Sequence, residues 1–283
     1  MRDYLLAVLF GIVEGVTEFL PVSSTAHIRL AQDLLDVPMD DPFWKIFAII
    51  IQLGAVLCIP LHFFDRFVKF VSTFPRGEGG NRSALNHPLS LVVLAAVVTA
   101  GPAYLLDRKI GENLESLTII AAALIIGGML MWAIDSAHTK VTTESIEQMR
   151  FWQAMIIGAA QIVAAAFPGT SRSFATIVAG ETVGLTRPAA VEFSFFLAVP
   201  IMFGASLLKL AQVFFTAAND PNWHVQMTPH LWAVLATGFI TSFLVAWAVV
   251  CWFMHWVHRH GFVPFAVYRI LLGLGIFGWL ALQ

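Results

Sequence analysis

The chain has 283 residues, of which 58% are hydrophobic and 12% are charged, and its mean hydropathy is +0.79. An ordinary soluble domain carries about 25% charged residues, so a chain this apolar would expose too much hydrocarbon surface to water. The formal net charge of −2 excludes a broadly basic surface, and with it a nucleic-acid-binding protein. The composition therefore indicates an integral membrane protein.

Two apolar stretches are short and broken. The first, Tyr4–Leu20, is interrupted by Glu14 and Glu18, and no small-residue cleavage site follows it, so we expect it to be retained rather than removed as a signal peptide. The second is Phe151–Phe167, and each stretch runs into a proline followed by hydroxyl residues. Proline cannot continue a helical hydrogen-bond ladder, and non-helical backbone at membrane depth survives only inside protein or beside a water-filled cavity. Both segments are therefore expected to be re-entrant.

Six stretches have the roughly 20 mostly apolar residues that a membrane-spanning helix needs. They are Phe43–Phe64, Pro88–Leu106, Leu117–Ile134, Ala189–Phe215, Leu231–Trp256 and Pro264–Leu280. Six spans and two re-entrant segments put both termini on one side of the membrane. The loop after the first span carries Arg66, Lys69, Arg76 and Arg82, so it is expected in the cytoplasm and the termini outside.

The two broken stretches match each other at a constant offset. The matched pairs are Gly11 with Gly158, Pro21 with Pro168, and Ser24 with Ser171. The first copy enters from outside and the second from inside, which is the signature of inverted repeats; chance similarity between glycine-rich apolar sequences is the alternative. The expected fold is an all-α polytopic membrane protein with six transmembrane helices and two re-entrant segments. Its single transmembrane domain, 1–283, consists of inverted repeats 1–146 and 147–283.

The first broken stretch carries two carboxylates at helical spacing. Glu14 and Glu18 are four residues apart and so lie on one face of a helix. Ionisable residues inside a membrane segment are costly and mark a functional site by default. Two like charges on one face need a metal ion, an arginine or a shared proton. The alternative is a pair near the interface that reaches toward water.

The first break adds hydroxyl groups and a histidine, at Ser23, Ser24, Thr25 and His27. A histidine can exchange a proton near neutral pH. Ser24 or Thr25 can supply a hydroxyl nucleophile, and either can instead cap the helix that follows. The residues alone leave both roles open.

The second break carries a cation among hydroxyls. Arg172 lies between Ser171 and Ser173, with Gly169 before them and Thr176 one turn later. The planar fork of arginine matches phosphate oxygens, and free N–H groups at a helix start complete an anion cradle. The two breaks together fit phosphoryl transfer by positioning and charge stabilisation, so we expect them to meet around one diphosphate.

Other polar residues in the spans are weaker candidates than the breaks. Glu192 and Lys209 are interpreted as pairing or structural groups in the fourth span. Tyr268 and Arg269, near the last span, are interpreted as anchors at the membrane interface.

Both breaks resemble signature stretches of the undecaprenyl-diphosphate phosphatase family, also called bacitracin-resistance proteins. The similarity runs nearly end to end, and the stretches that carry it are residues 14–25, 168–173, 192–200 and 264–269. The resemblance implies a hydrolase of the bacterial inner membrane with its active site facing outward. Such an enzyme converts undecaprenyl diphosphate, the lipid carrier of peptidoglycan synthesis, to the monophosphate. Bacitracin resistance follows because the antibiotic sequesters the diphosphate form.

The resemblance also implies site residues and partners. It places catalytic roles on Glu14, Glu18, Ser24, His27 and Arg172, and substrate binding on Ser23, Thr25, Gly169, Ser171, Ser173 and Thr176. It implies a homodimer and a divalent cation, Mg²⁺ or Ca²⁺, with Glu14 and Glu18 as candidate ligands. Direct attack by water instead of Ser24 stays open. The rival function is a polyprenyl-phosphate transporter or flippase, which would not need an acid–base set beside its anion cradle.

Two positions depart from the family pattern, which has glycine at both. Ala26 stands before the histidine, and Phe174 follows Ser173. If the family glycines hold positive φ, side chains at these positions would strain the backbone.

Overall fold

The computed structural model describes residues 1–38, 41–77, 80, 83–110, 116–137, 140–219 and 227–282, with the backbone alone at 104–110 and 216–219. Arg82, one of the four loop cations, lies outside these ranges. The described chain is helical, with short 3₁₀ turns at Ala84–Asn86 and Ile146–Gln148. Its α-helices are α1 (Arg2–Thr17), α2 (Ser24–Leu34), α3 (Pro42–His62), α4 (Phe64–Ser72), α5 (Pro88–Ile110), α6 (Leu117–Ser136), α7 (Phe151–Ala166), α8 (Arg172–Thr182), α9 (Arg187–Asn219), α10 (Pro229–Val257) and α11 (Val263–Leu280).

Five of these helices are long and apolar enough to cross a membrane, namely α3, α6, α9, α10 and α11. Each coincides with a predicted span to within a few residues. The remaining predicted span is α5, a helix of 23 residues whose fully described apolar part is Pro88–Ala103. The all-helical architecture and five of the predicted spans are thus confirmed.

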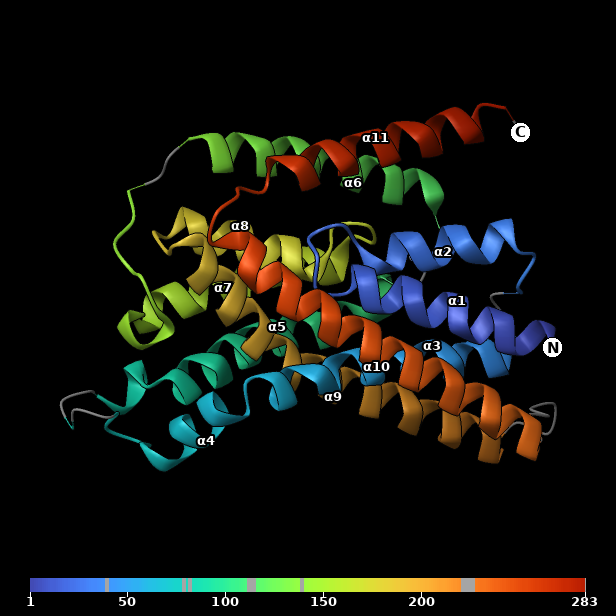
Figure 1. Cartoon of the computed structure of the whole chain (residues 1–283), viewed down its shortest axis with the longest axis horizontal. Coiled ribbons are helices and arrows are strands. Elements are labelled where there is room, and N and C mark those ends of the chain that lie inside the picture. Colours follow the sequence, from blue (N-terminus) through green and yellow to red (C-terminus); the bar gives the residue numbers. More distant parts are fainter. Residues whose placement is uncertain are drawn as a thin grey trace.

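The two broken segments form helical hairpins that come from opposite ends of the molecule (Figure 1). The α1–α2 hairpin has its open end where both termini lie, and its bend lies near the middle. The α7–α8 hairpin has its open end at the opposite end of the long helices. The two bends touch, because the Ser173 hydroxyl donates a hydrogen bond of 2.8 Å to the carbonyl of Leu20.

Each bend turns at a serine in the left-handed backbone region. Ser23 has φ 75° and caps α2 by accepting from the Ala26 N–H, and Ser171 has φ 73° and caps α8 by accepting from the Phe174 N–H. This conformation is uncommon for a residue with a side chain and persists where the surrounding structure enforces it. The equivalent residues are therefore Ser23 and Ser171. The sequence match, which paired Ser24 with Ser171, is wrong by one residue.

Glycines allow the hairpin helices to approach the long helices closely. A Cβ atom on Gly15 of α1 would lie 2.8 Å from the carbonyl oxygen of Ser242 in α10. A Cβ atom on Gly158 of α7 would lie 2.6 Å from the carbonyl oxygen of Ala95 in α5. Both distances are too short for real carbon contacts, so only glycine fits there without a shift. The packing of α1 on α10 and of α7 on α5 fixes the position of each bend.

Candidate active site

The carboxylates of Glu14 and Glu18 lie at the end of α1, next to the first bend. The helix ends at Thr17, and Glu18 keeps helical backbone angles and donates its N–H to the Glu14 carbonyl. The two side chains therefore share a face, as predicted. Both residues are buried, at 5% and 6% exposed, which excludes the alternative of a pair reaching into open water.

Glu18 joins the two bends. The Ser24 hydroxyl donates a hydrogen bond of 2.6 Å to Glu18 Oε2, and Arg172 Nη2 donates one of 3.1 Å to Glu18 Oε1, across 154 positions of sequence. The predicted meeting of the two bends is confirmed. Because Ser23 caps α2, the Ser24 hydroxyl is left for Glu18. A hydroxyl bonded to a carboxylate at this length forms a strong charge-assisted pair.

The guanidinium of Arg172 contacts Glu18 and two residues of α9. Its Nη1 donates to the carbonyl of Ser194 at 3.1 Å, and its Nη2 also lies 3.1 Å from Met202 Sδ, both on α9. Its Nε is buried and has no hydrogen-bond partner among the described residues. The predicted phosphate clamp is thus held against Glu18 and α9, at the point where the bends meet.

His27 is bonded through both ring nitrogens. Its Nδ1 lies 2.7 Å from the carbonyl of Ser23, and its Nε2 lies 2.6 Å from the hydroxyl of Tyr268. A carbonyl only accepts, so Nδ1 donates, and Nε2 of the neutral ring accepts from the tyrosine. His27 therefore ties the bend that carries Ser24 to Tyr268 of α11, and its catalytic role stays a prediction.

The hydroxyls of the second bend are bonded within the protein. The Ser171 and Ser173 hydroxyls lie 2.9 Å apart, and Ser173 donates to the carbonyl of Leu20. The Thr176 hydroxyl lies 2.7 Å from that of Ser194. These residues, predicted to bind substrate, hold α8 against the first bend and α9.

Arg269 is a central residue of the site that the sequence interpretation missed. It is 0% exposed, so its prediction as an interface anchor is wrong. It donates hydrogen bonds of 3.0–3.3 Å to the carbonyls of Pro21, Ala123, Gly169 and Thr170. Both bends are thereby tied to one side chain of α11. The sequence feature that could have identified Arg269 is its place inside an apolar helix, because a buried arginine is costly unless it has partners.

Neither departure from the family pattern strains the backbone. Ala26 lies in α2 and Phe174 in α8, and neither residue has positive φ. The Phe174 ring lies 4.4 Å from the guanidinium carbon of Arg269, a cation–π contact. The extra side chain thus covers the buried arginine.

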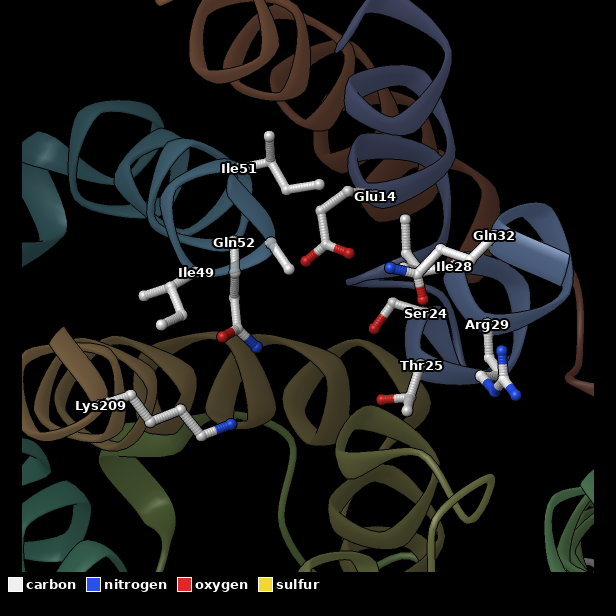
Figure 2. Close-up of a pocket in the computed structure, with 11 residues that line it drawn as sticks. Glu14, Ser24, Thr25, Ile28, Arg29, Gln32, Ile49, Ile51, Gln52 and Lys209 are labelled. Atoms are coloured by element: carbon white, nitrogen blue, oxygen red, sulfur yellow. The ribbon is translucent and has the colours of Figure 1, made fainter. Parts of the chain in front are cut away.

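A cavity of about 170 Å³ lies between α1, α2, α3 and α9 (Figure 2). Three predicted site residues line it: Glu14, Ser24 and Thr25. Glu18, His27 and Arg172 are not in the lining, and Glu18 reaches the cavity through its bond to Ser24. Polar residues that were not predicted for the site complete the wall: Arg29, Gln32, Gln52 and Lys209.

Glu14 suits a divalent cation better than Glu18 does. Both oxygens of Glu18 are bonded, to Arg172 and to Ser24, whereas the Glu14 carboxyl group, which also shares a hydrogen bond with Glu18, faces the cavity. The described residues contain no cluster of three or more His, Cys, Asp or Glu side chains that could hold a metal by itself. Mg²⁺ is commonly held by one or two carboxylates together with substrate phosphates. Glu14 and the amide oxygen of Gln52 fit such a shared site.

Comparison with known proteins shows what the chain is similar to. Residues 7–275 match the family described as "Bacitracin resistance protein BacA". A protein from Koribacter versatilis named undecaprenyl-diphosphatase is 50% identical over 282 residues, covering 99% of both chains. Proteins of the same name from Lactobacillus delbrueckii and Deinococcus radiodurans are 37% and 36% identical over 276 residues, covering 97% and 96% of this chain and 96% and 93% of theirs. This multi-pass membrane protein belongs to the BacA family of bacitracin resistance proteins.

Proposed function

We propose that this chain hydrolyses undecaprenyl diphosphate to undecaprenyl phosphate and inorganic phosphate. The shared name of its full-length relatives supports the reaction. The observation that most directly supports the proposed mechanism is the 2.6 Å hydrogen bond from Ser24 to Glu18, beside a cavity in the membrane-spanning part of the chain. A hydroxyl with a carboxylate in hydrogen-bond reach has the geometry of a nucleophile and its base.

The first step is attack of the Ser24 hydroxyl oxygen on the terminal phosphorus. The hydroxyl proton passes to Glu18, and the bond from the terminal phosphorus to the bridging oxygen breaks. The electron pair leaves with that oxygen on the lipid monophosphate. Because Glu18 becomes neutral, its hold on Arg172 weakens, and the positive charge of Arg172 then stabilises the transferring phosphoryl group.

The second step is attack of water on the phosphoserine. The bond between phosphorus and the Ser24 oxygen breaks, the proton on Glu18 returns to that oxygen, and inorganic phosphate leaves. Direct attack of water on the diphosphate is the alternative mechanism, with Glu18 as base and Ser24 only as a hydrogen-bonding group.

A divalent cation, Mg²⁺ or Ca²⁺, would be held by Glu14 and the substrate phosphates. When bound, it supplies charge neutralisation to the diphosphate. Glu18 would stay the base, because its oxygens are committed to Ser24 and Arg172.

We also propose the membrane arrangement. The hairpins from opposite ends, equal in length at 16 and 11 residues for their two helices, support inverted repeats 1–146 and 147–283, with α5 as the sixth span. The open end of the α1–α2 hairpin then faces outward, with both termini. The resemblance to the family further supports the proposal of a homodimer in the bacterial inner membrane that recycles the lipid carrier of peptidoglycan synthesis.

The opposed hairpins also favour a second candidate, a polyprenyl-phosphate flippase. One experiment separates the two functions. Purified protein in detergent is incubated with undecaprenyl diphosphate and Mg²⁺, and inorganic phosphate and the lipid product are measured. The proposed function predicts equal amounts of phosphate and undecaprenyl phosphate. Absence of phosphate release in detergent, together with movement of undecaprenyl phosphate between the leaflets of proteoliposomes that contain the protein, would support the flippase instead.

A further inference from the structure

The cavity has a second polar wall, and the proposed steps of phosphoryl transfer assign no role to its cation. Glu14 and Ser24 lie on one side of the cavity, and Gln52 of α3 and Lys209 of α9 lie on the other (Figure 2). The Lys209 side chain extends along the cavity with its ammonium end on the side of Gln52. A substrate bound to Ser24 therefore has a cation and an amide across from the nucleophile.

Lys209 is the unpaired cation of this lining. Arg29, the other cation of the wall, forms an ion pair with Asp33. Lys209 makes no ion pair or hydrogen bond with any residue that the structure describes, although it lies within the candidate span Arg187–Phe215. A charged side chain in a membrane span is costly and normally marks a site for a ligand or ion. The diphosphate of the proposed substrate is an anion that would fit this position.

The protein surface next to Lys209 is apolar and exposed. Leu207 and Leu208, its neighbours on α9, are 53% and 57% exposed, as expected for side chains that face lipid. Ala48 and Ile49 of α3 line the same cavity. The isoprenoid chain of a lipid diphosphate would leave the cavity on this side, so the phosphate attached to it would lie near Lys209.

We propose that Lys209, assisted by the Gln52 amide, binds the phosphate that remains on the lipid. This inference rests on the proposed function and adds the binding site of its leaving group. When Ser24 attacks the terminal phosphorus, the bond to the bridging oxygen breaks and its electron pair stays on the lipid phosphate. The ammonium of Lys209 stabilises this new charge, as a cation does at a leaving oxygen in phosphoryl transfer. The terminal phosphate is left to Ser24, Glu18 and Arg172.

The test uses two inhibitors that mimic the two halves of the substrate. Phosphate release from undecaprenyl diphosphate in detergent is assayed for the wild type, for Lys209→Met and Lys209→Arg, and for the control Lys140→Met. Undecaprenyl phosphate and inorganic phosphate serve as product inhibitors. Lys140 is exposed and precedes α7, far along the chain from the cavity lining. Lys209 is also exposed, so its substitution should preserve folding, which the elution profile and Tm in detergent check.

Lys209→Met should lower kcat/KM and raise the Ki for undecaprenyl phosphate, each by about tenfold to a hundredfold, because a charged hydrogen bond is lost. The Ki for inorganic phosphate should stay within about twofold, since that ion occupies the terminal-phosphate position. Lys209→Arg should recover most of the loss, and Lys140→Met should behave as wild type.

Three results would overturn the inference. An unchanged Ki for undecaprenyl phosphate in Lys209→Met would show that Lys209 does not bind the lipid phosphate. A parallel rise of both Ki values would place Lys209 at the whole site rather than at the leaving group. If Lys209→Met does not fold, Lys209→Gln and Lys209→Arg are compared instead. Equal Ki values for undecaprenyl phosphate in these two variants would also show that Lys209 does not bind the lipid phosphate. Failure of the wild type to release phosphate would instead refute the proposed function itself.

Discussion

Glu18 is the residue on which the two bends converge. One of its oxygens accepts from Ser24 and the other from Arg172, so in the proposed mechanism the group that takes the proton also holds the cation. This geometry makes the negative charge of Glu18 the quantity on which turnover depends. Removal of that charge should therefore affect catalysis far more than folding.

Glu18→Gln should lower kcat by at least about a hundredfold, because an amide cannot take the Ser24 proton. The amide can still accept from Ser24 or Arg172 through its one oxygen, so Tm in detergent should change little. The matched control is Glu144→Gln, at an exposed position in the 140–150 loop. Turnover of Glu18→Gln near the wild-type rate would exclude Glu18 as the base.

The two arginines at the bends, Arg172 and Arg269, should respond differently to substitution. Arg269→Met leaves three carbonyls in the bends and that of Ala123 in α6 without their donor and should cost several kcal/mol of unfolding free energy, since each unsatisfied buried acceptor costs about 1–3 kcal/mol, seen as a large fall in Tm. Arg172→Lys keeps a charge and should leave Tm almost unchanged while kcat falls by about a hundredfold, because the planar fork is lost. Equal losses of Tm in both variants would contradict this division of roles.

The cost of burying charge made part of the site predictable from sequence. It singled out Glu14, Glu18 and Arg172, which the structure brings to one bend or one cavity. The same reasoning did not find the contacts of Arg269 or the place of Lys209, because it does not tell which way a helix turns its face. That orientation comes from tertiary packing, and here it directs Arg269 inward to the bends and Lys209 to the cavity wall.

At the scale of elements, close packing of α1 on α10 positions the first bend. Gly15→Ala would place a methyl group 2.8 Å from the carbonyl oxygen of Ser242, so α1 must shift, carrying Glu14 and Glu18 with it. We expect a cost of about 1–3 kcal/mol and a fall in kcat. Gly204→Ala in α9 is the control, because a Cβ there meets nothing within 4 Å. Similar Tm and kcat in both variants would show that α1 does not depend on this contact.

The spans were predictable because long apolar runs have one solution in a bilayer, a hydrogen-bonded helix. The bends were harder to place. The prolines marked the breaks, but the chain turns at Ser23 and Ser171, which stand two and three residues after their prolines. Alignment on the prolines therefore pairs Ser171 with Ser24 and not with its structural equivalent, Ser23. Helix α4, a short amphipathic helix after the first span, was not predicted, because its nine residues carry Asp65, Arg66 and Lys69, and such a density of charge is also typical of a loop between spans.

At the scale of the whole molecule, the proposed arrangement predicts which ends of the helices face the outside. Single cysteines at Pro38 and Ser72, in a background in which Cys58 and Cys251 are replaced, test it; both positions are exposed. A membrane-impermeant maleimide should label Pro38→Cys in intact cells and Ser72→Cys only after permeabilisation. Labelling of both in intact cells would refute the span count or the orientation.

The proposed mechanism depends on Ser24 as the nucleophile of a lipid diphosphatase. The most direct test is the initial rate of phosphate release from undecaprenyl diphosphate by purified Ser24→Ala, compared with wild type and with Ser72→Ala, an exposed serine of α4. The proposed mechanism predicts that the rate of Ser24→Ala falls by at least about a thousandfold, since no other group replaces a covalent nucleophile. Ser72→Ala should keep the wild-type rate. A Ser24→Ala rate within about tenfold of wild type would contradict the proposed mechanism and favour direct attack by water, because loss of one hydrogen bond costs only about that factor.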